Sequence, residues 1–231
     1  MMKKQILLGN EAIALGLLEG GCQILTSYPG TPSSEILPGA VKLIKAEGLD
    51  TYTEWSTNEK VALDNAFAAA IVGKRAACCM KQVGLNVAAD SLMSAAYLGT
   101  VGALVIISCD DPGPHSSQTE QDSRLEGRAM AKFALDLSEE YKVPVVLRPA
   151  IRICHARQDI SWEKLQSKGA KASFEKDPTH WAATPRFRYL LHKELNKKLQ
   201  EMSRRFDTLK EFNFHNLQEG KTYKLGIVAG G

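Results

Sequence analysis

The sequence predicts an α/β fold: a doubly wound parallel sheet, followed by a C-terminal helical connector. Short apolar runs alternate with longer segments of helical periodicity through the first two thirds of the chain. Residues 103–109 form a continuous apolar run, which is typical of a parallel strand buried on both faces. Turns that contain glycine or proline follow three of the runs. Such turns lie at the carboxyl edge of a parallel sheet, where open α/β domains bind their ligands.

The elements of this domain follow from local signals. Polar Asn10 and Glu11 begin a helix, and two glycines end it. Thr31 and Pro32 suit the N-cap and the first position of the next helix. The third helix is rich in alanine, which favours close packing. The expected strands are residues 22–28, 51–55, 76–80, 103–109 and 143–148, and the expected helices are residues 10–19, 32–48, 58–72, 85–97 and 129–141.

Three regions are expected along the chain. Residues 1–157 form the α/β domain, in which Pro144 indicates an early or edge position for the last strand. Residues 158–220 form a connector that is polar and irregular to residue 183 and then helical from Thr184 and Pro185. A strand is expected over residues 223–228, so residues 221–231 are interpreted as the start of a truncated next domain. We therefore expect an N-terminal piece of a longer protein.

Composition argues against several classes of protein. The 231 residues are 44% hydrophobic, which suits a globular domain with a sizeable core. No apolar run approaches the ~18 residues of a membrane helix, and no signal peptide is recognisable, so a cytoplasmic location is expected. A net charge of +3 is too small to indicate nucleic-acid binding. Neither the five cysteines nor the five histidines have metal-ligand spacing, so reduced core thiols and no metal site are expected.

Three turns carry the candidate chemistry, and we expect them to meet at one edge of the sheet. They cover residues 27–34, 80–90 and 109–117. No G-x-G-x-x-G, Walker or G-x-S-x-G pattern is present. This absence disfavours a dinucleotide site, an NTPase and a serine hydrolase of the common type.

Two of these turns allow a structural and a functional interpretation. Thr31 is either an ordinary N-cap or a group near a helix start that binds an anion such as a carboxylate. His115, Ser116 and Ser117 fit either a solvated polar loop or the wall of a site. The residues alone leave both pairs of alternatives open.

Glu59 presents the same choice. The run Ser56-Thr57-Asn58-Glu59 matches the S-x-x-E capping box, in which the glutamate bonds the N-cap amide. Alternatively, the Glu59 carboxyl faces the edge of the sheet, partly buried by Trp55 and the alanine-rich helix. Desolvation would then raise its pKa, so that it could share a proton with a heteroatom of a ligand.

Taken in order, five segments resemble the N-terminal pyrimidine-binding domain of the 2-oxoacid:ferredoxin oxidoreductases, and in particular the large subunit of the indolepyruvate enzymes. The similarity extends from about Leu7 to Arg157. Each segment alone is weakly diagnostic, whereas their order is specific. The segments are residues 28–35, 58–62, 80–90, 110–124 and 143–149.

The resemblance implies a thiamine diphosphate enzyme that oxidatively decarboxylates an aryl 2-oxo acid. Such an enzyme transfers the acyl group to coenzyme A and passes electrons through iron-sulfur clusters to ferredoxin. Glu59 matches the family's activating glutamate, which bonds a ring nitrogen of the cofactor's pyrimidine. The other implied cofactor-binding residues are Tyr28, Lys81, Gln82 and Asn86, and the implied substrate-binding residues are Thr31, His115, Ser116 and Ser117.

Part of the family's machinery has no counterpart in this sequence. The half that binds the diphosphate through magnesium is absent, as is the four-cysteine tail for 4Fe-4S clusters. Magnesium and the clusters are therefore expected outside this chain, and the chain alone is expected to be inactive. After Arg124 the chain also runs directly into the helix of residues 129–141, where family members have a further strand. A smaller β subunit and a homo-oligomer are the expected partners.

Other functions stay open. The nearest alternative is a sister enzyme for pyruvate or another 2-oxo acid such as 2-oxoglutarate. A second is a non-catalytic domain of the same fold that only pairs subunits, which the missing diphosphate half and the apolar face of the connector helix would suit. A Rossmann nucleotide binder is disfavoured because the glycine fingerprint is absent.

Overall fold

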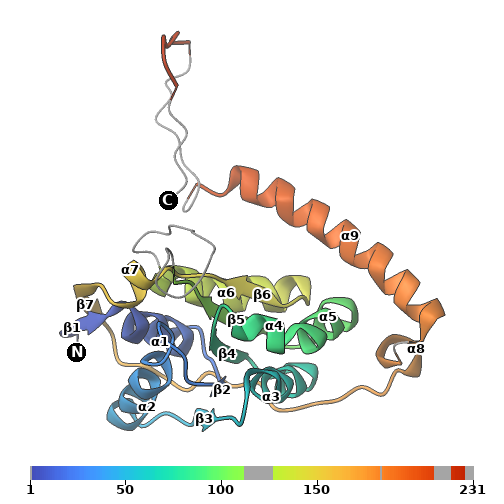
Figure 1. The fold of residues 1–231 in the computed structure, drawn as a ribbon, viewed down its shortest axis with the longest axis horizontal. Helices are drawn as coiled ribbons and strands as arrows, with labels where there is room; N and C mark the ends of the chain where they lie inside the picture. Colours follow the sequence, from blue (N-terminus) through green and yellow to red (C-terminus); the bar gives the residue numbers. More distant parts are fainter. Residues whose placement is uncertain (1, 112–126, 183, 211–219, 227–231) are drawn as a thin grey trace. The chain divides into compact units, whose positions relative to one another are not determined.

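The computed structural model describes residues 2–111, 127–182, 184–210 and 220–226. The chain forms two compact units, residues 1–176 and residues 177–231. Among the described residues, the first unit contains a five-stranded parallel sheet in the order β3-β2-β4-β5-β6 (Figure 1). Its strands are β2 (Ile24–Ser27), β3 (Tyr52–Trp55), β4 (Ala76–Lys81), β5 (Leu104–Cys109) and β6 (Val145–Leu147).

Helices cover both faces of this sheet, and Figure 1 shows α1 and α2 on one side and α3 and α5 on the other. Every residue of β5 is buried, and its side chains alternate between two apolar clusters. Val105 and Ile107 belong to one cluster, and Leu104 and Ile106 to the other. The predicted α/β fold with a parallel sheet is confirmed. Helices α1 (Gly9–Glu19), α2 (Ile36–Glu47) and α6 (Gly127–Tyr141) contribute to the first cluster, and α3 (Glu59–Ile71) and α5 (Ala89–Leu98) to the second.

The strand order reverses between β2 and β4. From β2 the chain passes to β3 on one side of it, and then back to β4 on the other side. Folds of this kind bind ligands outside the carboxyl ends of the strands at such a reversal. In register, Ser27 of β2 lies beside Trp55 of β3 and Cys79 of β4. The turns after these three strands therefore all start at one edge.

An antiparallel pair, β1 (Lys3–Leu8) with β7 (Arg157–Trp162), is not predicted by the sequence. Leu7 and Trp162 are the buried residues of these strands, and most of the others are exposed, so the pattern of an amphipathic strand is too weak to recognise. The expectation that residues 158–183 are irregular is therefore wrong for β7. The first compact unit also continues past the expected boundary at residue 157, because the chain that follows β7 remains part of it to Lys176.

The helix expected to start at Thr31 and Pro32 begins later, and this expectation is wrong. α2 starts at Ile36, and the preceding residues form turns with a cis peptide bond between Thr31 and Pro32. The Ser33 backbone amide and hydroxyl both donate to the Gly30 carbonyl, each at 2.8 Å. These bonds hold the stretch in a turn, so Thr31 is not the N-cap.

Other elements differ in detail. The helix expected over residues 85–97 is divided into α4 (Gly84–Val87) and α5. In the second unit, α9 (Pro185–Thr208) begins after its N-cap Thr184, as predicted. The described part of the strand expected over residues 223–228 is not a strand. The short helices α7 (Ile151–Cys154) and α8 (Pro178–Trp181) complete the described elements.

A search for membrane-spanning segments gives a negative result. Across the described ranges, no helix combines the length and the apolar character needed to cross a bilayer.

Candidate functional site

Glu59 is the first residue of α3 and lies at the carboxyl edge of the sheet. The Asn58 side chain caps this helix by accepting a hydrogen bond from the Val61 amide at 2.9 Å. The capping box from Ser56 to Glu59 is therefore not formed, because the true N-cap lies two residues after Ser56. The Glu59 side chain is partly buried, and its carboxyl makes no hydrogen bond or ion pair with the described residues. The carboxyl is thus not committed to holding the helix.

Gly84 brings the turn after β4 against this carboxyl. A Cβ atom on Gly84 would lie 2.5 Å from both Cγ and Oε1 of Glu59, closer than side chains approach one another. The missing side chain at residue 84 is what allows Glu59 to lie over the start of α4. The carboxylate also influences Cys78 of β4. Burial raises the pKa of this thiol to about 12, a hydrogen bond with Thr26 opposes the rise, and the Glu59 charge adds to it.

The turn after β2 meets the end of β4 at the same edge. The Tyr28 amide donates to the Cys79 carbonyl at 3.2 Å. A Cβ atom on Gly30 would lie 3.0 Å from the Cβ atom of Lys81, so the two backbones approach closely there. This contact lies at the reversal of strand order between β2 and β4.

Lys81 and Gln82 connect this edge to the end of β5. The Lys81 Nζ lies 3.3 Å from Oδ2 of Asp111, and the backbone N–H of Gln82 donates to the Cys109 carbonyl at 3.0 Å. The Gln82 side chain differs from its surroundings, because both its Nε2 and its Oε1 are buried and have no hydrogen-bond partner in the part of the chain that the structure describes. Unpaired buried polar atoms cost free energy. The side-chain amide of Gln82 therefore offers a donor and an acceptor to a bound group.

The structure places several predicted site residues near one another at the carboxyl edge of the sheet, whereas others are exposed or are not described. Asn86 in α4 and Thr31 are exposed. His115, Ser116 and Ser117 lie outside the described residues. Gly84 was not among the predicted site residues, although the turn of residues 80–90 was selected because this one glycine joins an apolar run to a helical pattern. The adjoining predicted residues are Tyr28, Glu59, Lys81 and Gln82.

The chemistry of this edge suits a polar nitrogen heterocycle. The unpartnered Glu59 carboxyl can share a proton with a ring nitrogen, and the Gln82 amide can donate to and accept from ring substituents. The close backbone at Gly84 leaves the carboxyl in place without a competing side chain. These groups fit the pyrimidine end of thiamine diphosphate.

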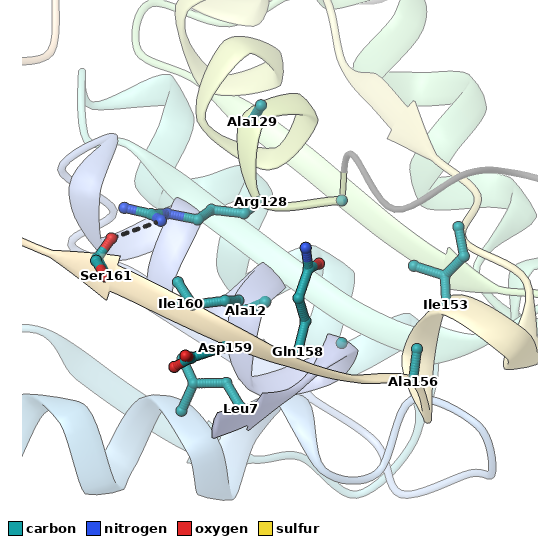
Figure 2. A pocket seen from close by; sticks show the side chains of 12 residues that line it. Leu7, Ala12, Arg128, Ala129, Ile153, Ala156, Gln158, Asp159, Ile160 and Ser161 are labelled. Carbon is teal, nitrogen blue, oxygen red and sulfur yellow. Dashed lines mark hydrogen bonds between the residues drawn. The ribbon is translucent and has the colours of Figure 1, made fainter. Parts of the chain in front are cut away.

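A cavity of about 350 Å³ lies elsewhere, among β1, β7, α1, α6 and α7 (Figure 2). Arg128 lines this cavity, and its guanidinium donates to the Ser161 carbonyl at 3.0 Å. Two further nitrogens of the guanidinium donate to the Glu19 carboxylate. Its guanidinium is therefore already occupied by the protein. None of the predicted site residues that the structure describes lines this cavity, and we assign the candidate site to the carboxyl edge of the sheet.

Comparison with known proteins gives close relatives. No protein-family model matches the chain. It is 39% identical to indolepyruvate oxidoreductase subunit IorA of Archaeoglobus fulgidus, over 99% of this chain and 39% of that protein. It is 40% identical to IorA of Methanothermobacter marburgensis, over 97% of this chain and 38% of that protein. A 2-oxoglutarate synthase subunit KorA, from Methanothermobacter thermautotrophicus, is 25% identical over 70% of this chain and 48% of that protein.

A solved structure supports the fold. The chain is similar to a 2-oxoglutarate:ferredoxin oxidoreductase from Magnetococcus marinus, with a TM-score of 0.67 over 87% of this chain and 45% of that chain. The sequence identity is 16%, so this likeness concerns the fold alone.

The fold is that of an α/β domain with a candidate ligand site at the reversal of its strand order. The relatives identify the group to which it belongs. The chain is a member of the 2-oxoacid:ferredoxin oxidoreductase family, as the ordered turns predict, and nearly its whole length matches the IorA subunits of indolepyruvate oxidoreductase. It spans less than half the length of these curated relatives.

Proposed function

We propose that this chain provides the pyrimidine side of a thiamine diphosphate site in an indolepyruvate (aryl 2-oxo acid):ferredoxin oxidoreductase. The observation that carries the proposal is the Glu59 carboxyl, which is partly buried, unpartnered among the described residues and held against Gly84. The side-chain amide of Gln82, which is buried and has no hydrogen-bond partner within the described ranges, supports the same assignment. The identity of 37 to 40% to indolepyruvate oxidoreductase subunits supports the substrate.

When bound, thiamine diphosphate would supply the carbon nucleophile that the decarboxylation of a 2-oxo acid requires. The residues of this chain bind and orient it. Glu59 holds a proton at a ring nitrogen of the pyrimidine, because none of the described residues competes for its carboxyl. In this proposal Tyr28, Lys81, Gln82 and Asn86 contact the cofactor, and Thr31, His115, Ser116 and Ser117 contact the 2-oxo acid.

The complete reaction needs components beyond these residues. Magnesium and the diphosphate-binding half, the 4Fe-4S clusters, coenzyme A and ferredoxin complete the proposed oxidative decarboxylation to an acyl-CoA. A smaller β subunit and further copies of the subunit are the proposed partners. The chain alone is then inactive, because it holds one side of the cofactor.

The test is Glu59→Gln in the complete enzyme. The amide keeps the size of the side chain but cannot hold the proton in the same way, so we expect a loss of turnover of about 10²- to 10⁴-fold. Indolepyruvate-dependent reduction of ferredoxin measures it, and gel filtration checks that the complex still assembles.

The matched control is Glu54→Gln. Glu54 is a carboxylate on the neighbouring β3, where it accepts hydrogen bonds from Tyr52 and Asn65. Near-normal turnover is expected for this variant. Normal turnover of the Glu59 variant would contradict the proposed role.

Two relatives are named for other 2-oxo acids, and one of them is a ketoisovalerate oxidoreductase subunit VorB that is 24% identical over 94% of this chain. KorA is named a 2-oxoglutarate synthase subunit, and it matches 70% of this chain. A panel of indolepyruvate, pyruvate and 2-oxoglutarate with the complete enzyme separates these specificities. Highest kcat/KM with indolepyruvate is expected, and no turnover of any of the three would favour a non-catalytic assembly domain.

A further inference from the structure

Asn10 is a fully buried amide in the first turn of α1. Its Nδ2 donates to the Pro32 carbonyl at 2.7 Å and to Oε2 of Glu35 at 2.8 Å. Bonds to a charged acceptor are among the stronger hydrogen bonds in proteins. Both bonds cross from α1 to residues 28–35, which we call the Thr31 turn.

The Thr31 turn is anchored at both ends. Its start is fastened to β4 by the bond from the Tyr28 amide to the Cys79 carbonyl. Its end is fastened to α1 by Asn10, since the regular backbone bonds of α2 begin only after this turn. The exposed Thr31 lies between the two anchors. Its position at the edge of the sheet therefore depends on Asn10.

The start of α1, which carries Asn10, is itself held in place by backbone contacts. The Gly9 amide donates to the Ala156 carbonyl at 2.9 Å. A Cβ atom on Gly9 would lie 1.6 Å from the Ile153 carbonyl oxygen, so α1 and α7 are in backbone contact there. Because the start of α1 is held in this way, a movement of the Thr31 turn away from α1 would break the two bonds from Asn10.

We infer that Asn10 is a positioning residue for the 2-oxo acid, which it serves by holding Thr31 in place without touching substrate or cofactor. This inference rests on the proposed function. The Nδ2 bonds to Pro32 and Glu35 set the end of the Thr31 turn, and the turn presents Thr31 to the substrate carboxylate or carbonyl. Asn10 thus controls substrate binding more than cofactor binding.

The test is Asn10→Ala in the complete enzyme. KM for indolepyruvate rises about 10- to 100-fold, because a displacement of about 1 Å at a contacting group has effects of that size. The concentration of thiamine diphosphate that gives half-maximal activity stays within about threefold, since Asn10 does not reach the groups around Glu59. In an Asn10→Ala/Thr31→Ala double variant the two effects on KM are not additive, because both act on one contact.

Hydrogen exchange gives a readout that is independent of activity. Asn10→Ala speeds exchange of the backbone amides of the Thr31 turn, measured by mass spectrometry on the whole complex. Ser138→Ala is the matched control. It removes a buried side chain that bonds the Leu104 amide and the Val143 carbonyl at the other ends of the strands, and it leaves exchange in the Thr31 turn and KM unchanged.

A milder variant covers the case in which Asn10→Ala does not fold. Glu35→Ala removes one of the two bonds, and the Glu35 side chain is 43% exposed, so the fold is retained. Its KM rises in the same direction by a smaller factor. Unchanged exchange in the turn, an unchanged KM, or additive effects with Thr31→Ala would overturn the inference. Full turnover of Glu59→Gln would instead refute the proposed function, so the two failures are distinguishable.

Discussion

Glu47 is a buried carboxylate and Glu59 a partly buried one in the same compact unit, and their surroundings differ. The Glu47 side chain is 1% exposed, and its Oε1 accepts from Nζ of Lys3 at 2.7 Å and from Nε1 of Trp162 at 3.2 Å. This carboxylate joins the end of α2 to β1 and β7. Glu59 has no such partners among the described residues. The contrast separates a carboxylate that stabilises the fold from one to which the proposed function assigns a ligand.

The titration of Glu47 agrees with a structural role. Burial alone raises the pKa of this carboxyl, but the hydrogen bonds from Lys3 and Trp162 and the charge of Lys3 outweigh burial. The net result is a pKa below the ordinary value. Removing either carboxylate should therefore affect a different property: stability for Glu47 and turnover for Glu59.

Apart from replacing Glu59 itself, the largest expected effect comes from filling the space beside it. Gly84→Ala places a methyl group 2.5 Å from the Glu59 carboxyl oxygen, which must move. Turnover of the complete enzyme should fall about 100-fold, since small displacements of a reacting group have effects of this order. Alanine is a good helix former, so the melting temperature should change little.

Gly226→Ala is the control for this substitution, because a Cβ atom there meets nothing within 4 Å. Turnover should stay normal in this variant. Normal turnover of Gly84→Ala as well would break the contrast, because the position of Glu59 would then not matter.

A smaller effect is expected from Glu47→Ala, and it should appear in stability. The variant loses two hydrogen bonds to a charged acceptor and leaves the Trp162 N–H unpaired, so the free energy of unfolding should fall by about 2 to 3 kcal/mol. Urea unfolding of the chain measures this change. Asp159→Ala, which removes the exposed ion pair with Lys4, should lower the free energy of unfolding much less, because solvent screens this pair. Equal losses in the two variants would show that burial of Glu47 contributes nothing.

The smallest effect is a dependence of stability on pH. Because folding lowers the pKa of Glu47, its ionised form stabilises the folded state above the pKa of the unfolded chain, near 4.5. This contribution is lost as pH falls through the lower folded-state pKa. The difference in unfolding free energy between wild type and Glu47→Ala should thus shrink below pH 4.5. A difference that grows on acidification would assign Glu47 the opposite shift.

The sequence was sufficient to predict the five-stranded parallel sheet, but not the separate antiparallel pair of β1 and β7. The apolar run around Val105 predicts a buried parallel strand correctly, because a strand that is buried on both faces has apolar side chains at consecutive positions. β1 and β7 were missed because each buries little, and their pairing joins parts of the chain that are far apart in sequence. No local window contains that information.

The candidate site shows the same limit. Thr31 and Pro32 have the composition of a helix start, but the bonds from Ser33 to Gly30 hold this stretch as a turn. The S-x-x-E pattern before Glu59 competes with Asn58, which takes the N-cap position instead. Local propensity therefore identified the turns, and tertiary contacts decided what each side chain does within them.

The short link between β3 and α3 has a consequence for how this site is recognised in other proteins. The Ser56 amide is bonded to Ser27 at 2.9 Å, and Glu59 follows only three residues later as the first residue of the helix. A glutamate one position further along α3, with the packing of the helix unchanged, would point about 100° away around the helix axis and would no longer face Gly84. A distant relative that keeps a glutamate here but not this spacing would share the architecture without the site, so the length of the link is as informative as the residue itself.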